Sequence, residues 1–188
     1  MKILVVSNAP WAKTGYGTQG ASLAKRLQAD GHYVAYMCNY GLQGGNVTWN
    51  GIPCLTNGLE GGYADPIVHG HIRTIQPDLV LTIFDVWALL RREFPLPKAL
   101  EHIAPRWAAW IPIDHSPVSA SNLEVVQRIT YPISMSRHGH EQLNTAGFTN
   151  TYIPHGVEKD VYFTSAGRKE FRRLIELPED AILFGSVG

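Results

Sequence analysis

Three glycines near the N-terminus, Gly15, Gly17 and Gly20, form a GxGxxG pattern within the segment TGYGTQG. In proteins that bind nicotinamide dinucleotides, the first glycine of this pattern lies at the turn from the first strand into a helix, and an acidic residue ends the second strand. Here the first apolar run ends at Val6, well before Gly15, and no carboxylate follows the end of the second run at Cys38. The pattern therefore argues against a dinucleotide site.

The same segment still suits a site for a negatively charged ligand. It precedes an expected helix, whose first N–H groups and positive dipole end favour a phosphate or a developing negative charge. Gly15 and Gly17 would permit the backbone to approach such a ligand closely, and the rings of Tyr16 and Trp11 could stack on a sugar. The alternatives are a flexible loop without a ligand and aromatic residues that serve only local packing.

His115 follows the apolar run RWAAWIPI and one aspartate, where its side chain would project over a cleft. An imidazole donates or accepts a hydrogen bond at neutral pH, so His115 could orient a sugar hydroxyl or stabilise charge in a transition state. The alternative is a histidine that bonds only the backbone at a strand end. Asp85 and Asp114 also follow apolar runs, although a carboxylate in this position often only caps the next helix.

Two His-x-His pairs, His69 with His71 and His138 with His140, have the spacing of metal ligands. Both pairs fall in expected helices, where residues two apart point to different sides. We therefore expect no metal site at either pair. Ser136 precedes the second of these helices and can cap it.

The apolar runs alternate with helical patterns, as in a doubly wound α/β protein. The expected strands cover residues 2–6, 32–38, 78–84, 106–113, 131–135 and 151–156, and the expected helices cover 18–31, 65–76 and 137–147. Two short β segments flank Asn50-Gly51, a dipeptide that tolerates the positive φ angles of a hairpin turn. The sequence thus predicts a Rossmann-like, mostly parallel sheet that binds ligands beyond the carboxyl ends of its strands.

The composition points to a small ligand in a cleft. Among 188 residues, lysine plus arginine and aspartate plus glutamate both total 16, so no excess charge would attract nucleic acid or an acidic membrane surface. Cys38 and Cys54 lie outside any CxxC pair and do not make a disulfide framework, which favours a reducing cytoplasm. Neither a signal-peptide core nor a run of membrane-spanning length is expected.

The C-terminal segment has a different character from the rest of the chain. Residues 167–180 form a charged amphipathic pattern, and residues 181–188, AILFGSVG, form an apolar run with no helix after it. We interpret 1–165 as one domain, and 166–188 as a linker helix and the first strand of a truncated second α/β domain. Because an apolar strand with unpaired edges recruits partners, self-association through 166–188 is expected.

The segment YIPHGVEKDVYF, residues 152–163, resembles the string IPNGVDxxxF that ends the N-terminal domain in glycosyltransferase family 4, the large retaining family with the GT-B fold. Gly156 and Val157 match the string, whereas His155 replaces its asparagine and Glu158 its aspartate. The resemblance extends along nearly all of the chain through KILVVSNAP, WIPIDHSP, YPISMSRHGHEQL and RRLIELPEDAILFGSVG. It departs at FDVW, where the family often has a histidine, and this leaves the role of Asp85 open.

The resemblance implies the N-terminal, acceptor-side half of an enzyme that moves a sugar from a nucleotide diphosphate sugar to an acceptor hydroxyl, with retention and without a metal or other cofactor. Most donor contacts would belong to a C-terminal domain beyond Gly188, so the chain alone is expected to be inactive. His115 would be catalytic, through contact with the donor sugar. The expected substrate- or phosphate-binding residues are Gly15, Tyr16, Gly17, Asp85, Ser136, Arg137, His155 and Gly156.

Two other functions share this architecture. The non-hydrolysing UDP-sugar 2-epimerases also pair two such domains over a nucleotide sugar, and a non-catalytic sugar- or nucleotide-binding module could keep the fold. The IPHGV string and the absence of a clear set of carboxylates favour transfer. The partners expected are therefore a nucleotide sugar, an unidentified acceptor and a C-terminal domain.

Overall fold

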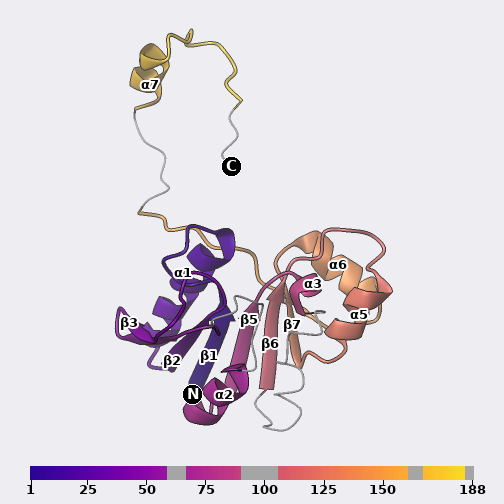
Figure 1. The fold of residues 1–188 in the computed structure, drawn as a ribbon. Helices are drawn as coiled ribbons and strands as arrows, with labels where there is room; N and C mark the ends of the chain where they lie inside the picture. Colours follow the sequence, from indigo (N-terminus) through magenta and orange to yellow (C-terminus); the bar gives the residue numbers. More distant parts are fainter. Residues whose placement is uncertain (59–66, 90–105, 161–166, 185–188) are drawn as a thin grey trace. The chain divides into compact units, whose positions relative to one another are not determined.

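The computed structural model describes residues 1–58, 67–89, 106–160 and 167–184, and it divides into two compact units, Met1–His155 and Gly156–Gly188. The strands of the first unit are β1 (Lys2–Ser7), β2 (Tyr33–Cys38), β3 (Val47–Trp49), β4 (Ile52–Leu55), β5 (Leu79–Ile83), β6 (Arg106–Ile111), β7 (Tyr131–Ser134) and β8 (Thr151–Tyr152). Its helices are α1 (Gly15–Ala29), α2 (Ile67–Ile75), α3 (Val86–Leu89), α5 (Ala120–Val126) and α6 (Arg137–Thr145). The second unit contains α7 (Arg168–Leu174) (Figure 1).

The first unit is built on one sheet with the strand order β3-β4-β2-β1-β5-β6-β7-β8 (Figure 1). All neighbouring strands run parallel except β3 and β4, which form the hairpin expected at the sheet edge. Asn50 and Gly51 have φ angles of 49° and 79°, as that turn requires. The mostly parallel α/β sheet predicted from the sequence is confirmed.

The strand order places a topological switch point beside β1. From β1 the chain moves to β2 and β4 on one side and then crosses to β5 on the other side. The connections leaving β1 and β5 therefore diverge, and open α/β sheets bind ligands in the crevice that this divergence leaves at the carboxyl ends of the strands.

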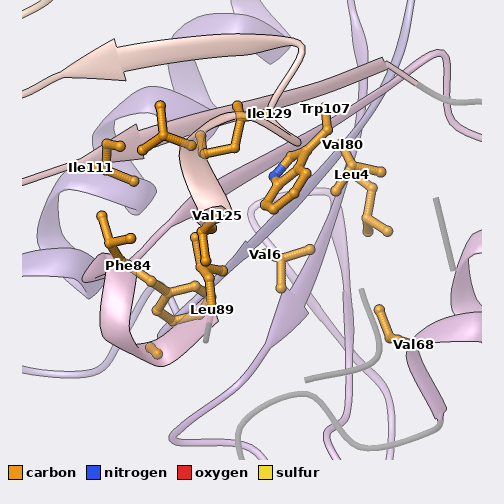
Figure 2. Packing of buried hydrophobic residues seen from close by; sticks show 14 of the residues in the cluster. Leu4, Val6, Val68, Val80, Phe84, Leu89, Trp107, Ile111, Val125 and Ile129 are labelled. Atoms are coloured by element: carbon orange, nitrogen blue, oxygen red, sulfur yellow. The ribbon is translucent and has the colours of Figure 1, made fainter. Parts of the chain in front are cut away.

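Apolar side chains cover both faces of the sheet, which explains why its central strands are continuous apolar runs. Along β1, Leu4 and Val6 belong to one buried cluster, whereas Ile3 and Val5 belong to another on the opposite face. The first cluster also takes side chains from α2, α3 and α5 (Figure 2) and Leu143 from α6. Helix α1 packs on the second cluster through Ala24.

Helix α1 begins at Gly15, three residues earlier than predicted. Thr14 is its N-cap: the Thr14 hydroxyl accepts a hydrogen bond from the Gly17 N–H at 3.0 Å and another from the Asn8 amide at 3.0 Å. The capping hydroxyl satisfies one of the first N–H groups of the helix, so a helix can start within a glycine-rich segment. The segment interpreted as a loop is therefore the first turn of α1.

Helix α5, which begins after the N-cap Ser119, was not expected from the sequence. The last strand of the first unit is shorter than expected, since β8 contains only Thr151–Tyr152 rather than residues 151–156. Residues 65 and 66, the first two of the helix expected over 65–76, lie outside the described residues.

In the second unit, α7 ends at Leu174, earlier than the expected end at residue 180. Glu176 adopts a φ of 56°, which turns the chain out of the helix, and the Arg172 guanidinium donates hydrogen bonds to the carbonyls of Pro178 at 2.6 Å and Ala181 at 2.7 Å. Residues 181–184 form no strand, contrary to expectation, and 185–188 lie outside the described residues. Within 167–184 no other strand is present to supply the pairing that a strand needs.

Gly20 on α1 leaves the space that the Tyr36 side chain occupies. A Cβ atom at position 20 would lie 2.1 Å from the Tyr36 hydroxyl oxygen, and that hydroxyl donates a hydrogen bond to the Asn8 carbonyl at 2.8 Å. Burial raises the pKa of Tyr36 above its ordinary value, so the phenol remains a donor. This contact joins α1, β2 and the loop after β1.

We predict that Gly20→Ala lowers the free energy of unfolding by about 1–3 kcal/mol, because overpacking displaces Tyr36. Urea denaturation measures the change. In the Tyr36→Phe background the same substitution should cost less. Gly70→Ala in α2 is the matched control: a Cβ there meets no atom within 4 Å, so that variant should be stabilised by about 0.5–1 kcal/mol. Equal effects of Gly20→Ala in both backgrounds would contradict the prediction.

Candidate functional site

The candidate site lies at the carboxyl ends of the strands that flank the switch point. Strand β5 neighbours both β1 and β6, and their carboxyl ends lead to three groups of residues. The first turn of α1 follows β1, Asp85 follows β5, and Asp114 and His115 follow β6. The topology therefore brings Gly15, Asp85 and His115, which are distant in sequence, to the same edge of the sheet.

The two glycines of the first turn of α1 have different roles. A Cβ at Gly17 would lie 2.5 Å from the carbonyl oxygen of Ala12 and 2.9 Å from that of Ala9, so the fold itself requires glycine there. Gly15 is exposed, and no atom of the described residues lies within 4 Å of the place where its Cβ would be. Close ligand approach is therefore open at Gly15, whereas Gly17 is explained by packing against the preceding loop.

Tyr16 and Trp11 are held by contacts within the protein. The ring of Tyr16 is half-buried and meets the ring of Phe84, at the end of β5, edge to face with centroids 6.4 Å apart. The Trp11 indole N–H donates a hydrogen bond to the Gly41 carbonyl at 2.9 Å, yet the ring remains partly exposed. Tyr16 thus links the loop after β1 to β5, and Trp11 links it to the segment after β2.

His115 forms a hydrogen-bonded pair with the aspartate that precedes it. Its Nδ1 lies 2.7 Å from the Asp114 carboxylate, and its Nε2 lies 3.5 Å from the side-chain nitrogen of Asn122. The hydrogen bond from His115 lowers the pKa of Asp114, so this carboxylate stays ionised at neutral pH. An ionised carboxylate only accepts, so Nδ1 carries the proton and Nε2 of the neutral ring is an acceptor.

Asn122 lies beside His115 but was not expected there, because it belongs to helix α5, which the sequence did not predict. Its backbone N–H donates to the Ser119 hydroxyl at 3.2 Å, which places the Asn122 side chain on the first turn, facing His115. The motif Ser-x-x-Asn after Pro117 was the signal available in the sequence, since a serine there can cap a helix.

Asp85 is half-buried at the end of β5, and its backbone carbonyl accepts the Ala88 N–H at 3.0 Å as α3 begins. Within the described residues, no hydrogen bond or ion pair engages its carboxylate. The side chain is therefore available to a ligand at the switch point.

The remaining predicted residues lie farther along the sheet. Ser136 caps α6 through the Gly139 N–H at 3.0 Å, as expected, and the Arg137 guanidinium lies over the Tyr152 ring at 6.0 Å. His155 meets the Trp110 ring edge to face at 5.1 Å, and burial lowers its pKa. Gly156 begins the second compact unit and is not grouped with these residues.

One histidine of each His-x-His pair bonds neighbouring protein groups. His71 Nε2 lies 2.8 Å from the Thr56 carbonyl. His140 contacts the side-chain amide oxygen of Asn150 through Nδ1 at 2.9 Å and the Asn144 side-chain amide nitrogen through Nε2 at 3.1 Å, and the Ser134 hydroxyl donates to the same Asn150 oxygen. The described part of the chain contains no cluster of three or more His, Cys, Asp or Glu side chains that could hold a metal ion.

A cavity of about 350 Å³ lies beside the switch point, at the ends of β2 and β4. The described residues that line it are Asn39, Tyr40, Gly41, Leu42, Gln43 and Asn57. The cavity was not expected from the sequence, in which this segment is distinguished only by the lack of a carboxylate after Cys38. None of the helices described is both long and apolar enough to cross a membrane.

The sequence matches no protein-family model and no curated protein sequence. Solved structures do match it. The chain aligns over 94% of its length with an E. coli trehalose-6-phosphate synthase bound with UDP-2-fluoro glucose, at a TM-score of 0.56 and 9% identity, and over 96% with the catalytic domain of Arabidopsis thaliana starch synthase IV bound to ADP and acarbose, at 0.54 and 14%. It also aligns over 84% with Acinetobacter baumannii MurG, at 0.52 and 11%.

The chain has the fold of a GT-B half-domain. It spans 55%, 60% and 46% of the lengths of those three proteins, respectively. At these identities the likeness concerns the fold alone. The predicted fold class is therefore confirmed, whereas membership of family 4 stays a prediction.

We predict that His155 titrates below the ordinary histidine pKa of about 6.5, because partial desolvation beside the Trp110 ring disfavours the imidazolium even though much of the residue is exposed. A lowered pKa means that the folded chain binds the proton less well than the unfolded chain. The stability contribution is thus complete above about pH 6.5 and is lost as the pH falls towards the folded pKa. NMR titration of the ring measures the midpoint. In His155→Gln, the loss of stability between about pH 7 and 5 should be smaller; a midpoint at or above the ordinary value would contradict this.

Proposed function

We propose that this chain is the acceptor-side half of a longer glycosyltransferase, which moves a sugar from a nucleotide diphosphate sugar to an acceptor hydroxyl with retention and without a metal. In this reaction the bond between the anomeric carbon and the diphosphate breaks, and the acceptor oxygen bonds to that carbon on the same face. The proton of the acceptor hydroxyl leaves with the diphosphate.

The observation that carries the proposal is the grouping of Gly15, Asp85 and His115 at the switch point of a GT-B half-domain. The structural neighbours include one protein bound with UDP-2-fluoro glucose and another bound to ADP and acarbose, which supports a nucleotide sugar as donor here. The chain covers about half the length of these proteins, which supports a second domain as the holder of most donor contacts.

His115 has the geometry to bind a sugar hydroxyl. With its proton on Nδ1 facing Asp114, the ring presents the Nε2 lone pair, and its contact with Asn122 at 3.5 Å is long enough to be replaced by a hydroxyl donor. The side chain is 48% exposed, so a sugar can reach it. In this proposal His115 is the catalytic residue that contacts the donor sugar, and Asp114 positions its ring.

The other predicted site residues have supporting positions. Gly15, on the open first turn of α1, would let backbone N–H groups approach the acceptor or the diphosphate. The Asp85 carboxylate is placed to accept from sugar hydroxyls, whereas Tyr16, Gly17 and Ser136 support the site through packing and capping. Arg137, His155 and Gly156 remain proposed substrate-binding residues on the resemblance of their segments.

Two further parts of the proposal concern the chain in solution. Cys38 and Cys54 are buried free thiols, which supports a reducing cytoplasm as the location of the chain.

In the second unit the side chains of Leu174, Ile182 and Phe184 are strongly exposed, which supports self-association of the chain through residues 166–188.

We predict that His115→Ala in the complete enzyme lowers kcat by two to three orders of magnitude, or about 3–4 kcal/mol, with little change in acceptor KM, because the contact acts mainly in the transition state. Steady-state transfer assays test this. Asp114→Asn keeps the shape beside the ring but loses the charge that selects the tautomer, so it should lower kcat by a smaller factor. If folded His115→Ala keeps more than about a tenth of the turnover, the catalytic role is wrong.

We predict that the 188-residue chain binds nucleotide sugars weakly and transfers none of them, because most donor contacts belong to the second domain. Isothermal titration with UDP-, ADP- and GDP-sugars measures the affinity. A dissociation constant below about 1 μM, equivalent to more than about 8 kcal/mol, would show that the donor site is already complete in this chain.

A further inference from the structure

The cavity at the ends of β2 and β4 is separate from the residues proposed to act on the donor sugar. Strand β2 and strand β6, which leads to His115, are separated by β1 and β5. Three strand spacings correspond to a lateral distance of about 14 Å. A group held in this cavity therefore does not itself contact His115.

Hydrogen bonds from other segments hold the wall of the cavity in place. The buried Asn57 side chain donates to the Asn39 carbonyl at 3.0 Å, and the Ala9 N–H donates to the Tyr40 carbonyl at 2.7 Å. The Trp11 indole N–H donates to the Gly41 carbonyl at 2.9 Å. Because these bonds use the backbone carbonyls of residues 39–41, the wall is pre-organised while the side chain of Tyr40 remains exposed.

The described residues of the lining carry no ionic group, and they combine polar and apolar surface. Asn39, Gln43 and Asn57 contribute amides, Tyr40 contributes a phenol, and Leu42 contributes an apolar surface. Amides and phenols both donate and accept hydrogen bonds, which matches a hydroxyl, whereas a phosphate or carboxylate finds no cationic side chain among these residues. A neutral sugar also offers C–H faces that can pack on the aromatic ring of Tyr40.

We propose that Asn39, Tyr40, Gln43 and Asn57 form a binding site for a neutral sugar unit of an extended acceptor. The distance from His115 makes this unit remote from the reacting hydroxyl, so the acceptor is an oligosaccharide or glycoside longer than one sugar. The role of this sugar as part of an acceptor rests on the proposed function, whereas binding of a neutral oligosaccharide in this cavity does not.

The test uses the 188-residue chain and measures binding directly. Maltopentaose, cellopentaose and chitopentaose are titrated into ¹⁵N-labelled protein, with pentagalacturonate as the charged probe of equal length. We expect at least one neutral probe to shift the resonances of residues 39–43, Asn57 and the Trp11 indole, with a dissociation constant at least tenfold lower than that of pentagalacturonate. Shifts confined to other parts of the chain, equal binding of the charged probe, or no binding up to about 10 mM, about −3 kcal/mol, would overturn the proposal.

Two exposed tyrosines at opposite ends of β2 give a matched pair of variants. Tyr40 is 62% exposed just after β2, at the cavity, and Tyr33 is 47% exposed at the opposite, amino end of β2. Tyr40→Ala keeps the backbone carbonyl that bonds Ala9 and should weaken binding of the neutral probe at least tenfold, whereas Tyr33→Ala should leave it unchanged. Gln43→Ala, another exposed position in the wall, should also weaken binding. Unchanged affinity in folded Tyr40→Ala and Gln43→Ala would sink the proposal.

Failure of this binding site and failure of the proposed transferase function give different experimental results. If the chain binds the neutral probe in this cavity but the complete protein transfers no sugar, the binding site is supported and the proposed transferase function is wrong. If the complete enzyme transfers sugar, and Tyr40→Ala has the same kcat/KM as the unsubstituted enzyme for both short and long acceptors, the transferase function is supported and the binding site is wrong.

Discussion

The burial of β1 on both faces is the constraint on which the rest of the first unit depends. The side chains of β1 alternate between two apolar clusters, one on each face of the sheet. Helices must therefore cover both faces. Strand β1 pairs with β2 on one edge and with β5 on the other. The connections that leave the carboxyl ends of β1 and β5 therefore run in opposite directions along the sheet. The crevice that results is a consequence of packing, and the polar residues at the strand ends occupy it.

The approach to this crevice is shaped by close contacts of backbone and small residues. Gly17 allows the first turn of α1 to lie against the carbonyls of Ala9 and Ala12, and Gly20 allows the Tyr36 hydroxyl to reach the Asn8 carbonyl. The loop after β1 is thus fastened to α1 and β2 at several points. A rigid arrangement of this kind can present Trp11 in the loop and Gly15 on the first turn of α1 to ligands in defined positions.

Polar side chains in the structure form two kinds of arrangement. The side chains of Ser134, His140 and Asn144 each form a hydrogen bond with the Asn150 side chain, which stabilises the packing of α6 against β7 and β8. Asp114 and His115, in contrast, are exposed and bond each other while leaving ring nitrogen and carboxylate surface accessible. Satisfied networks support structure, whereas exposed, oriented groups remain able to bind a substrate.

The sequence by itself determined the α/β class, the strands of the central sheet and the hairpin at Asn50-Gly51, because these depend on local apolar runs and turn residues. It also placed Asp85 and His115 shortly after the strands that the structure assigns as β5 and β6. It could not determine that Gly17 and Gly20 are needed for packing, since their neighbours at positions 12 and 36 approach only in the folded chain. The pairing of His115 with Asn122 and the cavity behind Tyr40 were decided by tertiary structure alone, because each depends on how separate segments meet at the sheet edge.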